Sequence, residues 1–79
     1  MNDEFSVYQF FKDDLGYECV GQHVSSEAAV RLFKRFTNSV AAQMGVVIRV
    51  IITDDGDFCN MEWKFGEGVT FPVMGKRSG

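Results

Sequence analysis

The fold is decided by residues 46–65, which read VVIRVIITDDGDFCNMEWKF. Two apolar runs flank the pair Asp55-Gly56, and an Asp-Gly pair between such runs indicates a β-hairpin with a two-residue type I′ turn. That turn places eight apolar residues on one face, in the pairs Ile52 with Cys59, Val50 with Met61, Ile48 with Trp63 and Val46 with Phe65. The other face then carries Thr53 opposite Phe58, Ile51 opposite Asn60, Arg49 opposite Glu62 and Val47 opposite Lys64. A slip of one residue would turn the apolar set toward solvent, so the pattern predicts this register.

The composition favours one small domain built mainly on a sheet. The chain has 79 residues, near the lower limit at which a single hydrophobic core holds a chain together. Apolar residues make up 46% of it and include eight Phe, whereas Leu15 and Leu32 are the only leucines. Aromatic and β-branched residues must therefore fill the core, and these residue types favour strands. We expect one domain over residues 1–79, with a flexible tail at residues 75–79.

The N-terminal third predicts a second hairpin. Residues 5–11 and 17–24 favour strands, and turn-forming residues separate them. The register of this hairpin stays open, because two sets compete for the core face: Phe5, Val7 and Phe11 against Tyr8 and Phe10. A short helix is the alternative, with one apolar side formed by Phe5, Tyr8, Phe11 and Leu15.

The clearest helix follows Ser25, a suitable N-cap, and ends before Gly45, where a left-handed residue would terminate it. Its apolar side consists of Ala29, Leu32, Phe33, Phe36, Val40 and Met44. Its opposite side carries Arg31, Lys34, Arg35 and Asn38. An apolar arc this wide predicts a helix that lies flat on a sheet.

A last strand is expected over residues 69–72, after a loop with Gly68 in the left-handed position. It would pair Phe65 with Val69 and Trp63 with Phe71, and Pro72 marks it as an edge strand. The predicted fold is therefore α+β, a single antiparallel sheet with one helix packed on one face, in the order β-β-α-β-β-β. Trp63 should lie between the helix and the sheet, against Ile48 and against Phe33 or Phe36.

The net charge and the cysteine content limit the partners and the cellular compartment that we expect for this protein. The net charge of −3 weighs against a protein whose main task is to bind nucleic acid. Cys19 and Cys59 lie forty residues apart without a zinc-binding spacing, so we expect two reduced, buried thiols. The sequence opens with no apolar leader, and Arg49 interrupts its longest apolar run. We therefore expect a soluble cytoplasmic protein with no membrane segment.

No motif predicts catalytic, cofactor-binding or metal-binding residues. The acids around Gly56 resemble a calcium loop, but its first position would fall on Ile51, where a carboxylate is required. The Gly66-Glu67-Gly68 segment lacks the third glycine of a phosphate-binding loop. His23, the single histidine, is expected to make local capping or surface hydrogen bonds. An enzymatic activity is thus unsupported.

The second face of the sheet suggests binding. Val47, Ile51 and Phe58 would form an apolar stripe there, beside Arg49 and Glu62. Such stripes often mark partner surfaces, with a solvated face as the alternative, and small domains often gain stability by association. The sequence predicts a small non-catalytic binding or regulatory module that acts as a homodimer, with these five residues as its dimer or partner face.

Two other functions remain open. Arg31, Lys34 and Arg35 could form a nucleic-acid face, although the acidic total makes nucleic acid an unexpected partner. A pocket between the helix and the first hairpin could instead bind a small ligand.

Overall fold

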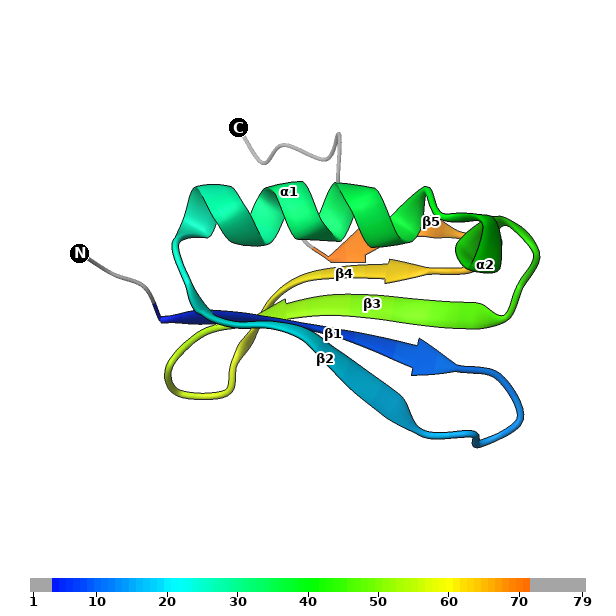
Figure 1. Ribbon diagram of the computed structural model, residues 1–79, viewed down its shortest axis with the longest axis horizontal. Helices are drawn as coiled ribbons and strands as arrows, with labels where there is room; N and C mark the ends of the chain where they lie inside the picture. The colour runs from blue at the N-terminus through cyan, green and yellow to red at the C-terminus, as the bar shows by residue number, and fades with distance from the viewer. Residues whose placement is uncertain (1–3, 72–79) are drawn as a thin grey trace.

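The computed structural model describes residues 4–71, so Pro72 and the tail expected at residues 75–79 lie outside the described part. A five-stranded antiparallel sheet with the strand order β2-β1-β3-β4-β5 carries one main helix (Figure 1). The elements are β1 (Phe5–Phe11), β2 (Tyr17–Val24), α1 (Ser26–Thr37), α2 (Val40–Gln43), β3 (Val47–Thr53), β4 (Cys59–Lys64) and β5 (Gly68–Phe71). The predicted class and order are confirmed, with α2 as a short addition.

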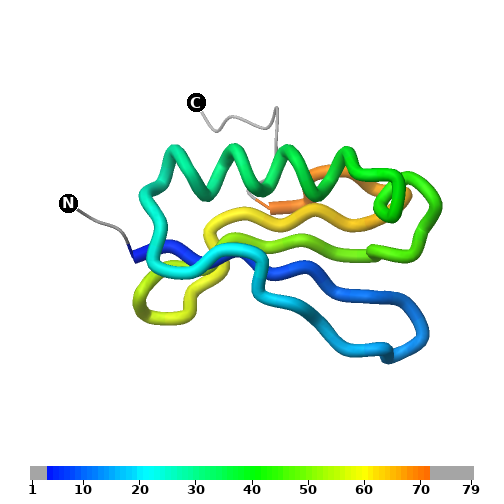
Figure 2. The backbone as a smooth tube through the Cα atoms, viewed as in Figure 1, coloured from blue at the N-terminus to red at the C-terminus, as the bar shows by residue number. Residues whose placement is uncertain are grey.

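The position of β1 sets the topology. It pairs antiparallel with both β2 and β3, so these two strands run parallel to each other. α1 and α2 connect them, and α1 packs against β1, β3 and β2. The tube in Figure 2 follows this connection from β2 through the helices to β3. This crossover covers one face of the sheet. We call the opposite face the open face.

The first hairpin forms two strands, and the helical alternative is wrong. Val7 is fully buried under α1, and Phe5 and Phe11 pack against the same core. Tyr8 and Phe10 therefore point to the open face, because successive residues of a strand alternate between faces.

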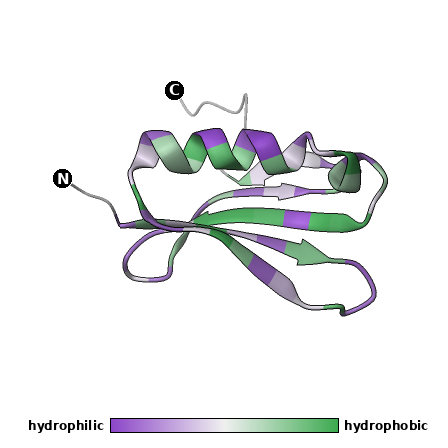
Figure 3. Cartoon of the chain, viewed as in Figure 1, coloured by the Kyte–Doolittle hydropathy of each residue, from purple (hydrophilic) through white to green (hydrophobic). Residues whose placement is uncertain are grey.

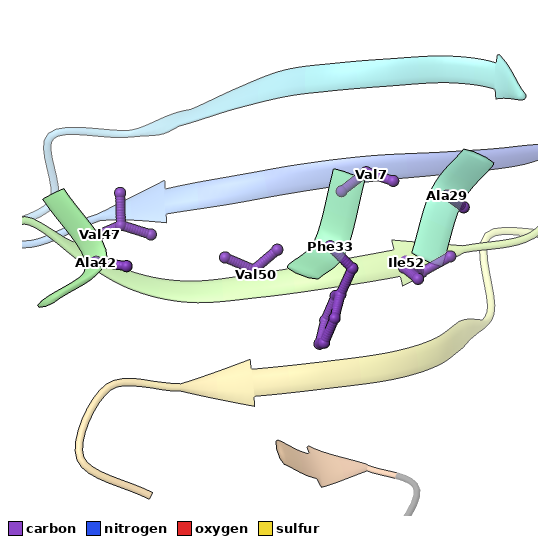
Figure 4. Close-up of a cluster of buried hydrophobic side chains, with 7 residues drawn as sticks. All are labelled: Val7, Ala29, Phe33, Ala42, Val47, Val50 and Ile52. Atoms are coloured by element: carbon purple, nitrogen blue, oxygen red, sulfur yellow. The ribbon is translucent and has the colours of Figure 1, made fainter. Parts of the chain in front are cut away.

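The core lies between α1, α2 and the three strands β1, β3 and β4. Seven buried residues form it (Figure 4): Val7, Ala29, Phe33, Ala42, Val47, Val50 and Ile52. β3 supplies three of them and is the most uniformly hydrophobic strand in Figure 3. At the edge of this core α1 approaches β2 so closely that a Cβ atom on Gly21 would overlap Leu32 Cδ1.

The helix begins as predicted and ends earlier. Ser25 caps α1, and its hydroxyl accepts a 3.1 Å hydrogen bond from the backbone N–H of Ala28. The chain leaves the helix after Thr37 because Ser39 is extended and caps α2 instead. Val40 and Met44, predicted on the apolar side, are consequently exposed. Gly45 has a φ of 81° and ends α2, as its predicted terminating role requires.

The central turn is not the predicted two-residue type I′ turn. Gly56 has no positive φ, whereas Asp57 takes the left-handed conformation with a φ of 65°. The backbone closes a three-residue loop through hydrogen bonds from Asp57 N–H to Asp54 O and from Asp54 N–H to Phe58 O. The Asp54 carboxylate favours this loop because it accepts hydrogen bonds from the N–H groups of Gly56 and Phe58.

The register of β3 against β4 differs from the prediction by two residues. The third loop residue shifts the pairing by one residue, and a bulge at Asn60 shifts it by another. Ile52 therefore faces Met61, and Val50 faces Trp63. A shift of two keeps each of these residues on its predicted face. Cys59 precedes the bulge and lies opposite Thr53, on the open face and not in the core.

A bulge at the start of β3 reverses a second prediction. Phe10 pairs with Arg49 and Phe11 with Val47, which leaves Ile48 without a partner on β1. Val47 therefore turns into the core, while Ile48 becomes exposed. Trp63 lies half-buried on the helix side, opposite Val50 and Val69, and not opposite Ile48 or Phe71 as predicted.

Candidate functional site: the open face of the sheet

The open face is built from side chains of all five strands. One cross-strand row runs from Tyr17 through Phe10 and Arg49 to Lys64. The next row runs from Cys19 through Tyr8 and Ile51 to Glu62. Paired residues of neighbouring strands share a face, so Tyr8, Phe10 and Tyr17 lie together on β1 and β2, and the charged groups lie on β3 and β4. Phe71 of β5 pairs with Glu62 and ends this face.

An ion pair occupies the centre of the face. Arg49 Nε donates to Glu62 Oε2 at 2.5 Å, and Thr70 Oγ1 donates to Glu62 Oε1 at 2.8 Å. The pair was predicted as directly opposite residues, but it forms diagonally, because Arg49 faces Lys64 and Glu62 faces Ile51. Hydrogen bonds from Thr70 and then Arg49 hold the pKa of Glu62 below its ordinary value, so its carboxylate stays ionised.

Aromatic rings continue from this pair toward β2. The Arg49 guanidinium lies 5.0 Å from the centroid of the Phe10 ring. The Tyr17 ring lies 5.5 Å from Phe10 and 5.9 Å, edge-on, from Tyr8. These distances are in the range of favourable cation–π and aromatic contacts, so the row forms one packed layer.

The layer ends at a hollow of about 290 Å³ beside the β1–β2 turn. Its lining comes from three segments: Phe10 and Phe11, Asp14, Gly16 and Tyr17, and Ile48 and Arg49. Two lining residues, Tyr17 and Ile48, leave 64% and 40% of their surface in solvent. Leu15 leaves 70% in solvent and lies in the turn between the lining residues Asp14 and Gly16. We call these three residues the apolar rim.

The predicted apolar stripe on this face does not form. Val47, only 1% exposed, belongs to the core on the other side of the sheet. Ile51 lies on the open face but is 8% exposed, because Tyr8 and Glu62 flank it on the neighbouring strands. Phe58 is exposed in the β3–β4 loop, where its ring lies against Gly56.

Arg49 and Glu62 are the predicted face residues that the structure brings together. The sequence interpretation missed Tyr8, Phe10 and Tyr17, because the register of the first hairpin was open. One signal was present in residues 5–11: tyrosine keeps its hydroxyl near water, so Tyr8 favours the solvated side of an alternating strand.

Within the described residues 4–71, the thiols and the histidine show no reactive arrangement. Cys19 and Cys59 are both free, as predicted, but Cys19 is exposed and Cys59 half-buried. Burial, followed by the negative charge of Glu62, raises the pKa of the Cys59 thiol, which disfavours the nucleophilic thiolate. His23 is exposed at the end of β2 with a φ of 55°, and Ser25 nearby is engaged as the α1 cap.

The cations predicted as a nucleic-acid face lie on the other side of the molecule. Arg31, Lys34 and Arg35 are exposed on α1 and border a shallow hollow of about 760 Å³, together with Ala28, Leu32 and Asn38. Among residues 4–71, Arg49 with Glu62 is the only ion pair within 4.0 Å, so no described carboxylate pairs with these cations.

Further observations bear on the class of protein. Within the described range, no group of three His, Cys, Asp or Glu side chains is placed to hold a metal ion. Neither helix of residues 4–71 is long and apolar enough to span a membrane. No protein-family model matches the chain, and no curated protein or solved structure shows significant similarity to it.

Proposed function

We propose that this chain is a binding module that forms a homodimer through its open face. The observation that carries the proposal is the apolar rim: Tyr17 and Ile48 are exposed in the lining of one hollow, and Leu15 is exposed in the turn beside it. Solvent-exposed apolar groups gathered at one site favour association with another protein surface. The two free thiols support a reducing, cytoplasmic setting for this module.

The charges of the open face suit a second copy of the chain. Arg49 and Glu62 neutralise each other, and Thr70 donates a further hydrogen bond to Glu62, so burial of this pair would leave neither of the two charges alone. Lys64, opposite Arg49, is exposed and would lie at the margin of the interface. A two-fold axis near this pair would bring each rim onto the partner's sheet, because such an interface presents the same patch twice. The molecule measures 35 by 32 Å across its broad side, large enough for the roughly 800 Å² per partner of a standard interface.

The oligomeric state tests the proposal. Sedimentation velocity from 1 to about 100 µM, a range suited to affinities of −8 to −5 kcal/mol, should show a dimer for the wild type. Tyr17→Glu should shift the protein to monomer, because it places two carboxylates at the interface while its exposed position leaves the fold intact. Phe58→Lys tests whether the β3–β4 loop belongs to the same interface.

Arg35→Glu is the control, since it reverses an exposed charge on α1, away from the open face. This variant should dimerise like the wild type. A monomeric wild type would exclude the homodimer. A dimer that resists Tyr17→Glu and dissociates with Arg35→Glu would move the interface to the helix side.

Nucleic-acid binding through α1 is a second candidate, favoured by one observation. Arg31, Lys34 and Arg35 line one hollow without a described carboxylate partner, and unpaired cations attract phosphate groups. Fluorescence anisotropy with labelled single- and double-stranded oligonucleotides tests it. Binding that falls with salt and with Arg31→Glu would support this candidate, and no binding at low salt would exclude it.

A further inference from the structure

The helix side of the sheet is covered over only part of its width. α1 packs against β1, β3 and β2. β4 and β5 carry Met61, Trp63 and Val69 on the same side, and all three are half-buried. One helix is about 10 Å wide and strands lie about 4.8 Å apart, so a single helix covers roughly two strands. The side chains of β4 and β5 thus form the floor of an uncovered strip beside α1.

This strip is a groove of apolar character. Its main hollow, about 220 Å³, is lined by Val30, Phe33, Lys34, Thr37, Met61 and Val69. A second hollow of about 120 Å³ continues it toward the start of α1, and Val30 and Met61 line both. Trp63 lies opposite Val69 on the neighbouring strand, at the edge of the same floor. We call this surface the α1–β5 groove.

We propose that the α1–β5 groove binds an acidic amphipathic helix of a partner protein. An amphipathic helix laid beside α1 would bury its apolar side on Met61 and Val69, a recurrent mode of peptide recognition. It would also complete the second layer of the sheet, in the position that a second helix would take next to α1.

The charge of the groove selects the partner. Among residues 4–71, Lys34 is the one charged residue of its main lining, and it lies exposed on the wall that α1 forms. No described carboxylate lies within 4.0 Å of it, so acidic side chains along one flank of the partner helix would complement it. A second copy of this chain fits poorly, because the outward side of its own α1 carries Arg31, Lys34 and Arg35. This inference goes beyond the proposed homodimer, since the groove lies on the helix side of the sheet, opposite the open face.

A helical-peptide display library tests the proposal without a known partner. The library is selected on the immobilised full chain and depleted on the Val69→Lys variant, whose folding is checked by circular dichroism. Enriched peptides should show apolar residues at i, i+3, i+4 and i+7 and acidic residues on one flank. The best peptide is then synthesised and titrated against the intrinsic fluorescence of Trp63, the single tryptophan.

Charge reversal supplies the matched control. Lys34→Glu should weaken binding of the synthetic peptide at least tenfold, and exchanging the peptide's Glu residues for Lys should restore binding to this variant. Arg31→Glu makes the same change of charge on α1 at a residue outside the groove lining, and should change the affinity less than twofold.

Four outcomes would overturn the proposal. They are enriched peptides without the amphipathic acidic pattern, equal binding by Val69→Lys, no effect of Lys34→Glu, and displacement of the peptide by a single-stranded oligonucleotide. A chain ending at Phe71 that binds the peptide tenfold more tightly would assign the groove to residues 72–79 instead. These results are independent of the homodimer, because Tyr17→Glu should leave peptide binding unchanged.

Discussion

Gly21 lies where α1 approaches β2 so closely that there is no room for a side chain. A Cβ atom there would overlap Leu32 Cδ1 and would touch Val7 Cγ2 at 3.9 Å. Overpacking of this kind costs about 1–3 kcal/mol, and alanine returns about 0.4–1 kcal/mol by restricting the unfolded chain. Gly21→Ala should therefore lower the free energy of unfolding by up to about 2.6 kcal/mol, less if Leu32 can turn away, with each kcal/mol lowering Tm by about 4–8 °C.

A double-mutant cycle with Leu32→Ala identifies the cause. Leu32→Ala removes the atom that the new methyl group meets, so Gly21→Ala should become neutral or stabilising by about 0.5 kcal/mol in that background. Urea unfolding followed by Trp63 fluorescence measures all four proteins. An equal cost of Gly21→Ala in both backgrounds would refute the close approach of α1 to β2.

Three further predictions concern the central hairpin and the ion pair. Asp54→Ala should lower Tm more than Gly56→Ala, because the Asp54 carboxylate binds two loop N–H groups and Gly56 has no positive φ; equal melting of the two variants would contradict this loop. Val47→Asn should cost roughly 2–5 kcal/mol in urea unfolding, whereas Ile48→Asn should cost little, and the reverse order would exclude the β3 bulge. Glu62 has a lowered pKa in the folded state, so its stabilising contribution is complete above its ordinary value of 4.5 and is lost as pH falls through the folded pKa. In Tm profiles against pH, Glu62→Gln should therefore differ from the wild type at neutral pH and converge with it in acid, and parallel profiles would contradict the assignment.

The element order could be read from the sequence because each element carries its own local signal. Ser25 and Gly45 bound the helical segment, and the alternating runs around the Asp-Gly pair indicate two paired strands. The helix break at Ser39 had a signal too, since serine is a preferred N-cap, but the apolar period ran on through Val40 and Met44 and concealed it.

The strand register could not be predicted, because a β-bulge or an extra loop residue shifts the pairing without changing the hydrophobic pattern around it. The Asp54 loop and the bulge at Asn60 each shift β4 by one residue, and together they preserve the faces of Met61 and Trp63. The bulge at Ile48 shifts β3 by one residue alone and moves Val47 from the expected partner face into the core. Pairing with β1 determines this bulge, and that contact is remote in sequence.

The candidate site shows the same division. Arg49 and Glu62 are close enough to pair in both registers, directly opposite in the predicted one and diagonally in the observed one. The sequence therefore predicts their ion pair even though the predicted register is wrong. The apolar rim depends on how the first hairpin meets β3, which places Tyr17 and Ile48 around one hollow. No local sequence pattern in residues 5–24 specifies how the first hairpin pairs with β3.

The most direct test of the open-face homodimer is an isotope-filtered nuclear Overhauser experiment on an equal mixture of labelled and unlabelled protein. Such a spectrum detects only contacts between different copies. The proposed interface predicts intermolecular signals from Leu15, Tyr17 and Ile48, and none from Leu32 or Phe33 on the helix side. Intermolecular signals confined to α1, or none at concentrations where the wild type sediments as a dimer, would contradict the open face as the dimer interface.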